Sequence, residues 1–245
     1  MDILSVAGLG FLAGAVTVVG GLLGMLFRID KRWLNFLLTA TTGLALAVIL
    51  LGMLPAALEM GGVGYTALGF ILGGVVFMVT GSLFPHTYGS ERYGDRLYSI
   101  LKTRSLVIAG LILYNIAAGL LIGAGFANSL KFGVIMVLAV ILQNIPRGVA
   151  IREPLSDSMT GSHRGLFIML LAGVPVLIGA AATFAALTSM VPAFLSTSTA
   201  FCSGALLFIV ADQMIPIVKG YSRMHEIAVA LFLGIFIGVL MLGIG

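Results

Sequence analysis

Apolar residues run along the chain in long blocks that are separated by short polar connections. A helix of roughly 18–25 residues crosses the ~30 Å hydrocarbon core of a bilayer. Eight blocks of about that length lie near residues 4–27, 34–58, 64–86, 104–126, 131–151, 164–189, 193–218 and 226–244. The pattern predicts an all-α integral membrane protein with eight transmembrane helices, which form a single transmembrane domain over residues 1–245.

The composition supports this interpretation and excludes several function classes. Hydrophobic residues make up 60% of the chain and charged residues only 9%, too few charges for the surface of a soluble protein. The single cysteine, Cys202, rules out an intrachain disulfide and a thiolate metal cage. An enzyme is not expected, because the apolar blocks contain no nucleophile with a nearby base and the connections are too short for a catalytic domain.

Basic residues are distributed very unevenly between the two sets of connections. Connections that follow the first, third, fifth and seventh blocks contain Arg28, Lys31, Arg32, Arg92, Arg96, Lys102, Arg104, Arg152, Arg164, Lys219 and Arg223. The other connections contain only Lys131. The positive-inside rule therefore places the first set in the cytoplasm and both termini outside. Orientation of the helices explains the basic pI, and no nucleic-acid partner is expected.

A short polar pattern occurs twice inside the apolar blocks. The first copy is Tyr114-Asn115-Ile116-Ala117-Ala118-Gly119, and the second is Gln143-Asn144-Ile145-Pro146-Arg147-Gly148. Amide and guanidinium groups are unfavourable at membrane depth unless they face a partner or a cavity. Residues 143 and 147 are four apart on one helix face, as are residues 114 and 118. The sequence therefore predicts a substrate pathway at these two motifs.

Four prolines lie inside the predicted spans and predict helix kinks. Each removes the hydrogen bond to the carbonyl four residues earlier. We interpret Pro55 and Pro175 as structural kinks. For Pro146 and Pro216, the neighbouring polar residues favour a pathway lined by freed backbone oxygens, which adds Asp212 and Gln213 to the predicted pathway.

Several segments, taken in order, resemble the ZIP (zinc/iron permease) family, and in particular its bacterial GufA-like branch. The two motifs are similar to the family's His-Asn-x-Pro-Glu-Gly and Gln-Asn-x-Pro-Glu-Gly helices. Residues 51–59, Leu-Gly-Met-Leu-Pro-Ala-Ala-Leu-Glu, resemble the end of its second helix. Residues 204–207 and 212–216, Gly-Ala-Leu-Leu and Asp-Gln-Met-Ile-Pro, resemble its seventh. The resemblance implies a ZIP-like bundle, metal transport and the cytoplasmic (inner) membrane of a prokaryote.

This chain departs from the family at the residues that the resemblance implies are metal ligands. Tyr114 occupies the position of the histidine in the family's fourth helix, and Ala118 that of the glutamate in the same helix. Arg147 and Val176 occupy the positions of the glutamates in the family's fifth and sixth helices. Zinc prefers imidazole, thiolate or carboxylate ligands. The usual zinc site is therefore not expected, and Asn115, Asn144 and Asp212 are only weak candidates for metal ligands.

Arg147 and Asp212 are the charges that remain within the predicted spans. They lie five and seven residues before Arg152 and Lys219, and therefore about 8 and 10 Å deep at helical rise. We predict that they form a salt bridge. It either replaces the metal as the link between the fifth and seventh helices or belongs to a transport path.

Two functions stay open. One is a ZIP-like transporter of a small inorganic ion, with a divalent metal as a possible substrate and no cofactor. The other is a non-transporting structural or regulatory homologue in which the Arg147–Asp212 pair closes the pathway. The expected partner is the lipid bilayer. The oligomeric state, a homodimer included, is not fixed by the sequence.

Overall fold

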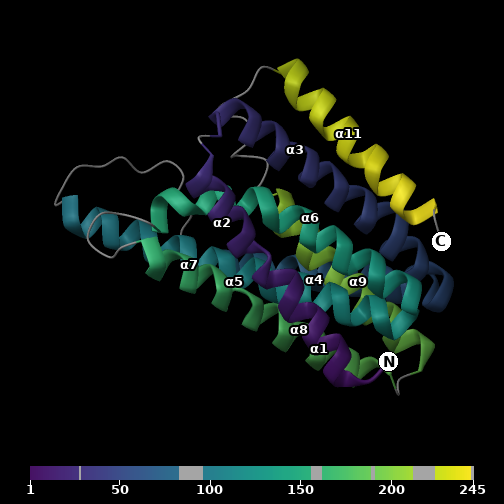
Figure 1. Cartoon of the computed structure of the whole chain (residues 1–245). Helices are drawn as coiled ribbons and strands as arrows, with labels where there is room; N and C mark the ends of the chain where they lie inside the picture. The colour runs from purple at the N-terminus through teal and green to yellow at the C-terminus, as the bar shows by residue number, and fades with distance from the viewer. Residues whose placement is uncertain (28, 83–95, 156–161, 189–190, 212–223, 244–245) are drawn as a thin grey trace.

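The computed structural model describes residues 1–27, 29–82, 96–155, 162–188, 191–211 and 224–243. The described residues form helices and no strands (Figure 1). These helices are α1 (Ile3–Ala15), α2 (Thr17–Leu26), α3 (Lys31–Ala47), the π-helix η1 (Val48–Met53), α4 (Leu54–Ser82), α5 (Arg96–Asn128), α6 (Leu130–Leu155), α7 (Ser162–Leu171), α8 (Gly173–Leu187), α9 (Pro192–Ile209) and α11 (Met224–Gly243).

Local sequence signals explain where several helices begin. The Asp2 side chain accepts a hydrogen bond from the Ser5 backbone N–H, and the Asp30 side chain accepts one from that of Arg32. Such side chains satisfy backbone donors that have no partner within the helix. Pro192 opens α9, where its missing N–H is not needed.

Seven stretches of the described residues are long and apolar enough to cross a membrane. They are Ile3–Leu26, Lys31–Gly81, Ile108–Asn128, Leu130–Arg152, Arg164–Leu187, Pro192–Ile209 and His225–Gly243. The prediction of an all-helical protein with several helices that can span a membrane is therefore confirmed. Six of the eight predicted blocks each begin within a few residues of one of these stretches, the block 34–58 falls inside Lys31–Gly81, and the block 64–86 begins inside it and ends outside the described residues.

The chain turns back within the long stretch Lys31–Gly81. Gly62 has φ 72° and ψ −177°, a left-handed backbone that glycine adopts readily. The Ser196 hydroxyl donates to the Ala57 carbonyl at 2.7 Å and lies 3.2 Å from the Thr66 hydroxyl. Residues 57 and 66 would be about 13 Å apart along a straight helix, so both can reach Ser196 only if the chain reverses between them.

Two predicted spans are interrupted in the structure. The block 4–27 divides into α1 and α2 at Val16, and the block 164–189 divides into α7 and α8 at Ala172. The second interruption lies three residues before Pro175, where a kink is predicted. The first was not predicted, because no proline lies near Val16; the Thr17 hydroxyl next to it donates to the Gly14 carbonyl at 2.7 Å.

The other prolines differ in their effects. Pro55 is the second residue of α4, next to the π-helix η1, after which the Leu54 N–H donates to the Ile49 carbonyl five residues earlier. The kink at Pro55 itself stays a prediction. Pro146 lies inside α6, which is helical on both sides of it. Pro216 lies outside the described residues.

Two helix pairs, each of which joins the N-terminal half of the chain to the C-terminal half, pack closely through glycines. In one helix pair, α11 on α3, a Cβ added to Gly43 would lie 2.3 Å from the Leu231 carbonyl oxygen and one added to Gly234 would lie 1.8 Å from that of Ala40. In the other pair, α4 on α9, a Cβ added to Gly204 would lie 2.1 Å from the Phe70 carbonyl oxygen. A Cβ added to Gly73 would lie 2.0 Å from the Phe201 carbonyl oxygen. Both pairs have the same residue spacing, as do the glycine crossings of α2 with α6 and of α5 with α8, so this packing unit recurs across the bundle.

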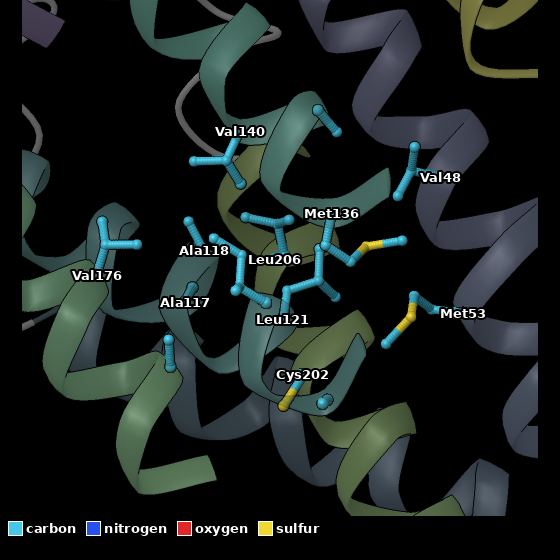
Figure 2. Close-up of a cluster of buried hydrophobic side chains, with 14 of the residues drawn as sticks. Val48, Met53, Ala117, Ala118, Leu121, Met136, Val140, Val176, Cys202 and Leu206 are labelled. Carbon is cyan, nitrogen blue, oxygen red and sulfur yellow. The ribbon is translucent and has the colours of Figure 1, made fainter. Parts of the chain in front are cut away.

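Helices α5 and α6 lie between these units, and their side chains form much of the core. Figure 1 shows α3 and α11 side by side at one edge of the bundle, with α6 nearer its middle. A buried apolar cluster joins α5, α6, α8, α9 and η1, and it includes Val48, Met53, Ala117, Ala118, Leu121, Met136, Val140, Val176, Cys202 and Leu206 (Figure 2). The two polar motifs lie on the same two central helices.

Candidate functional site

Four of the predicted pathway residues form one buried cluster between α5 and α6. Tyr114 of α5 donates a hydrogen bond from its hydroxyl to the Gln143 side-chain oxygen on α6. Arg147 of α6 places its guanidinium carbon 3.2 Å from the centroid of the Tyr114 ring. Arg147 Nη1 also donates to Asn144 Oδ1 at 3.0 Å. The two copies of the motif therefore meet through Tyr114, Gln143, Asn144 and Arg147.

The electrostatics of this cluster depend on Arg147. Its side chain is only 7% exposed and carries the positive charge of a guanidinium. Stacking on an aromatic ring stabilises a cation by about 0.5–2 kcal/mol. The Arg147 Nε atom has no hydrogen-bond partner in the described part of the chain. The centre of the bundle thus holds a positive charge that the stacking on Tyr114 offsets only partly.

Asn115 and Asn144 link the central helices to the two interrupted helices. Asn144 Nδ2 donates to the Ala13 carbonyl in α1 at 2.8 Å, and Asn115 Nδ2 donates to the Ala172 carbonyl at the α7–α8 break at 3.0 Å. A carbonyl near a helix interruption can lack its usual intrahelical donor, which the amide supplies. The Asn144 oxygen is occupied by Arg147, whereas the buried Asn115 oxygen has no partner among the described residues.

The glycine that ends each motif allows a close helix crossing. A Cβ added to Gly148 would lie 2.0 Å from the Thr17 carbonyl oxygen of α2, and one added to Gly119 would lie 2.4 Å from that of Val176 in α8. Real Cβ atoms do not approach backbone oxygens so closely. Each motif therefore combines an asparagine that holds an interrupted helix with a glycine that lets it approach, a role that the sequence analysis did not predict.

The remaining predicted site residues separate into two groups. Ala118 and Val176 are fully buried and belong to the apolar cluster of Figure 2. Asp212 and Gln213 lie outside the described residues, so the Arg147–Asp212 salt bridge stays a prediction. Among the described residues, no three His, Cys, Asp or Glu side chains come close enough to hold a metal ion.

Acidic side chains of the described segments lie away from this cluster. Asp2, Asp30 and Glu59 are exposed. Glu226 of α11 forms an ion pair with Arg32 of α3, with Arg32 Nε donating to Glu226 Oε2 at 3.1 Å. Among the side chains that the structure describes, which do not include that of Glu153 in α6, the central guanidinium therefore has no carboxylate counter-ion.

No protein-family model matches this chain. The protein named zinc transporter ZupT of Salmonella paratyphi A is 30% identical to it over 221 residues, which are 86% of this chain and 85% of the relative. ZupT of Salmonella newport and of Salmonella heidelberg give the same identity and coverage.

The chain belongs to the ZIP family of metal transporters. The resemblance stated from its motifs is thus confirmed at the level of the family, and the protein is a membrane transporter homologue. Its two motifs occupy α5 and α6, and each carries its own link to an interrupted helix.

Proposed function

We propose that this chain is a ZIP-type transporter of the bacterial cytoplasmic membrane, which it crosses eight times with both termini outside. The stretch Lys31–Gly81 supports the number of crossings, since its 51 residues would extend about 76 Å as one helix, more than twice a ~30 Å bilayer core. With a reversal at Gly62 it accounts for two of the eight. The distribution of basic residues supports the orientation.

The substrate is a small inorganic ion that passes the α5–α6 centre. Zinc is the substrate named for the relatives, and divalent metal is therefore the first to test. The residues at the centre argue against a tight zinc site, because a dication about 4 Å from the Arg147 charge would be repelled by roughly 8 kcal/mol at an effective dielectric of 20. Assignment to the GufA-like branch is part of the same proposal.

The observation that carries this proposal is the stacking of Arg147 on Tyr114. It places a permanent cation where the family resemblance implies a carboxylate, and it leaves one edge of the guanidinium without a described partner. The ZIP scaffold is retained around it, including both asparagines and both helix crossings. We infer that this chain keeps the transport path of the family but selects a different ion.

A second function is favoured by the burial of the same side chains. Tyr114, Gln143 and Arg147 are 1%, 4% and 7% exposed, and they fill the space between α5 and α6. In a non-transporting homologue, Asp212 would pair with Arg147 and hold this arrangement closed. Loss of one partner of such a pair would then destabilise the protein by about 3–5 kcal/mol, and loss of both by much less.

Uptake into proteoliposomes tests the two functions against each other. The purified chain is reconstituted and exposed to a panel of zinc, other divalent cations and small inorganic anions. A transporter gives uptake of at least one ion above protein-free liposomes, and Arg147→Met changes which ion is taken up. Absence of uptake for every ion, together with strong coupling between Arg147→Met and Asp212→Leu in a double-mutant cycle, supports the closed homologue instead.

A further inference from the structure

The described helices form two groups, each of which is interlocked within itself. Helices α1, α2, α5, α6, α7 and α8 make up the first group, and α3, η1, α4, α9 and α11 make up the second. Gly20 and Gly148 bring the backbones of α2 and α6 into contact, and Gly73 and Gly204 do so for α4 and α9. At every described glycine where an added Cβ would lie within 3 Å of the backbone of another helix, both helices belong to the same group. These crossings therefore hold each group together but do not join the two groups.

The seam between the two groups is filled by apolar side chains. Leu121 of α5 and Met136 of α6, from the first group, belong to the buried cluster of Figure 2 together with Met53 of η1, Cys202 and Leu206 of the second group. Methionine is unbranched and adapts its shape to changed neighbours. Contacts of this kind can separate at one end of the seam without loss of a hydrogen bond.

A side-chain hydrogen bond crosses the seam at one end. Asn128 is the last residue of α5, and its Nδ2 donates to the Thr199 hydroxyl of α9 at 3.1 Å and to the Ala124 carbonyl of its own helix at 2.8 Å. Thr199 is fully buried. Asn128 lies 14 residues beyond Tyr114, or about 21 Å further along the helix, at the end that the proposed topology places outside. The bond thus joins the outer ends of the two groups, far from the central cluster.

We propose that the Asn128–Thr199 hydrogen bond is a latch that keeps the outer end of the seam closed. The apolar cluster of Figure 2 lies between this end and the α5–α6 centre, so an ion enters from outside only after the latch has broken. A neutral hydrogen bond changes such an opening equilibrium by about 2- to 10-fold, so the latch favours the closed seam but can break readily. This inference rests on the proposed transport function, for which it supplies the outer closure.

The reactivity of Cys202 reports how often the seam opens. Cys202 is the single cysteine of the chain, is 3% exposed and lies about one turn from Thr199 on α9. The purified full-length protein in detergent is treated with N-ethylmaleimide, and the alkylated fraction is followed over time. We expect Thr199→Val and Asn128→Leu each to react about 2- to 10-fold faster than the unaltered protein. The double variant should react no faster than the faster single variant, because both changes remove the same bond.

Thr197→Val is the matched control on the same helix. The Thr197 hydroxyl donates to the Ala193 carbonyl of α9 at 2.9 Å, so its bond does not cross the seam. This variant should react at the rate of the unaltered protein. Unchanged rates for Thr199→Val and Asn128→Leu, or an equal acceleration by Thr197→Val, would overturn the latch.

A covalent lock tests the latch without variants that weaken it. Asn128→Cys and Thr199→Cys are combined with Cys202→Ala, and the pair is oxidised to a disulfide. Uptake into proteoliposomes should be at least about 10-fold lower for the oxidised protein than for the reduced one, because the outer end then stays closed in nearly every molecule. Undiminished uptake by the oxidised protein would contradict the latch, and failure of the pair to cross-link would contradict the contact itself. A protein that takes up no ion even when reduced contradicts the transport function, while the Cys202 rates still decide for or against the latch.

Discussion

At the scale of single residues, Arg147 and Tyr114 determine what the centre of the bundle can bind. Their contact places a guanidinium over an aromatic ring within a nearly dry environment. Neither the ring nor the neighbouring amides offer the negative charge that offsets dehydration of a dication. The change in selectivity that we propose follows from these two side chains.

The contact between Arg147 and Tyr114 should be measurable as a coupling energy. We expect Arg147→Met and Tyr114→Leu together to destabilise the protein less than the sum of the single changes, by about 0.5–2 kcal/mol. Reversible unfolding in detergent measures the difference. Tyr114→Phe is the control, since it keeps the ring and loses only the hydrogen bond to Gln143. Strictly additive losses would show that the stacking is not energetically significant.

The sequence predicted which residues gather at the centre but not all of their contacts. Arg147 and Gln143 are four residues apart on one helix face, and that spacing correctly grouped them. The stacking on Tyr114 could not be predicted, because it depends on how α5 and α6 are rotated toward each other. Asp212 lies outside the described residues, so the partner chosen for Arg147 from matching depth stays a prediction.

At the scale of helices, the two motifs act as docking points for interrupted helices. Asn144 and Gly148 hold α1 and α2, and Asn115 and Gly119 hold the region of α7 and α8. Sequence periodicity predicted the long spans, since apolar length decides membrane insertion. It did not predict the break at Val16, because no proline marks the break and one of its hydrogen bonds comes from Asn144 on a distant helix.

The glycine crossings give a direct test of this docking. Gly148→Ala should destabilise the protein by about 1–3 kcal/mol, because its Cβ would meet the Thr17 carbonyl oxygen at 2.0 Å and force the helices apart. Gly8→Ala on α1 is the matched control, since no atom lies within 4 Å of its added Cβ. Thermal unfolding of both variants in one detergent provides the comparison. A loss for Gly8→Ala as large as that for Gly148→Ala would refute the crossing.

The amide bonds to the interrupted helices should matter in the same way. Asn144→Leu removes the donor to the Ala13 carbonyl and should destabilise the protein by about 1–3 kcal/mol, the usual effect of leaving a buried carbonyl unpaired. Asn115→Leu removes the donor to the Ala172 carbonyl and should destabilise the protein to a similar extent. Hydrogen exchange should show faster exchange near Ala13 in the first variant and near Ala172 in the second. Unchanged exchange in both would exclude this role.

At the scale of the whole molecule, close glycine crossings recur around the central helices. They join α3 to α11, α4 to α9, α2 to α6 and α5 to α8. A sequence shows where the glycines are, but not which helices they join. Partner choice depends on the topology of the bundle, which a single sequence does not reveal.

The proposed topology predicts which positions face outside. Single cysteines at Asp2 and Val63, introduced with Cys202 replaced by alanine, should react with an impermeant thiol reagent added to intact cells. Val63 follows the reversal at Gly62 and its side chain is 75% exposed. A cysteine at Lys31 should react only after the cells are opened. Protection of Asp2 or Val63 in intact cells would contradict the orientation.

Zinc-edge anomalous diffraction from crystals soaked in zinc tests the central claim most directly. The account predicts no anomalous peak between α5 and α6 in the unaltered protein, because Arg147 repels the ion and Tyr114, Ala118 and Val176 provide no strong ligand. The variant that combines Tyr114→His, Ala118→Glu, Arg147→Glu and Val176→Glu should show a peak there. Anomalous density in the unaltered protein within bonding distance of Asn115 or Asn144 would contradict the account.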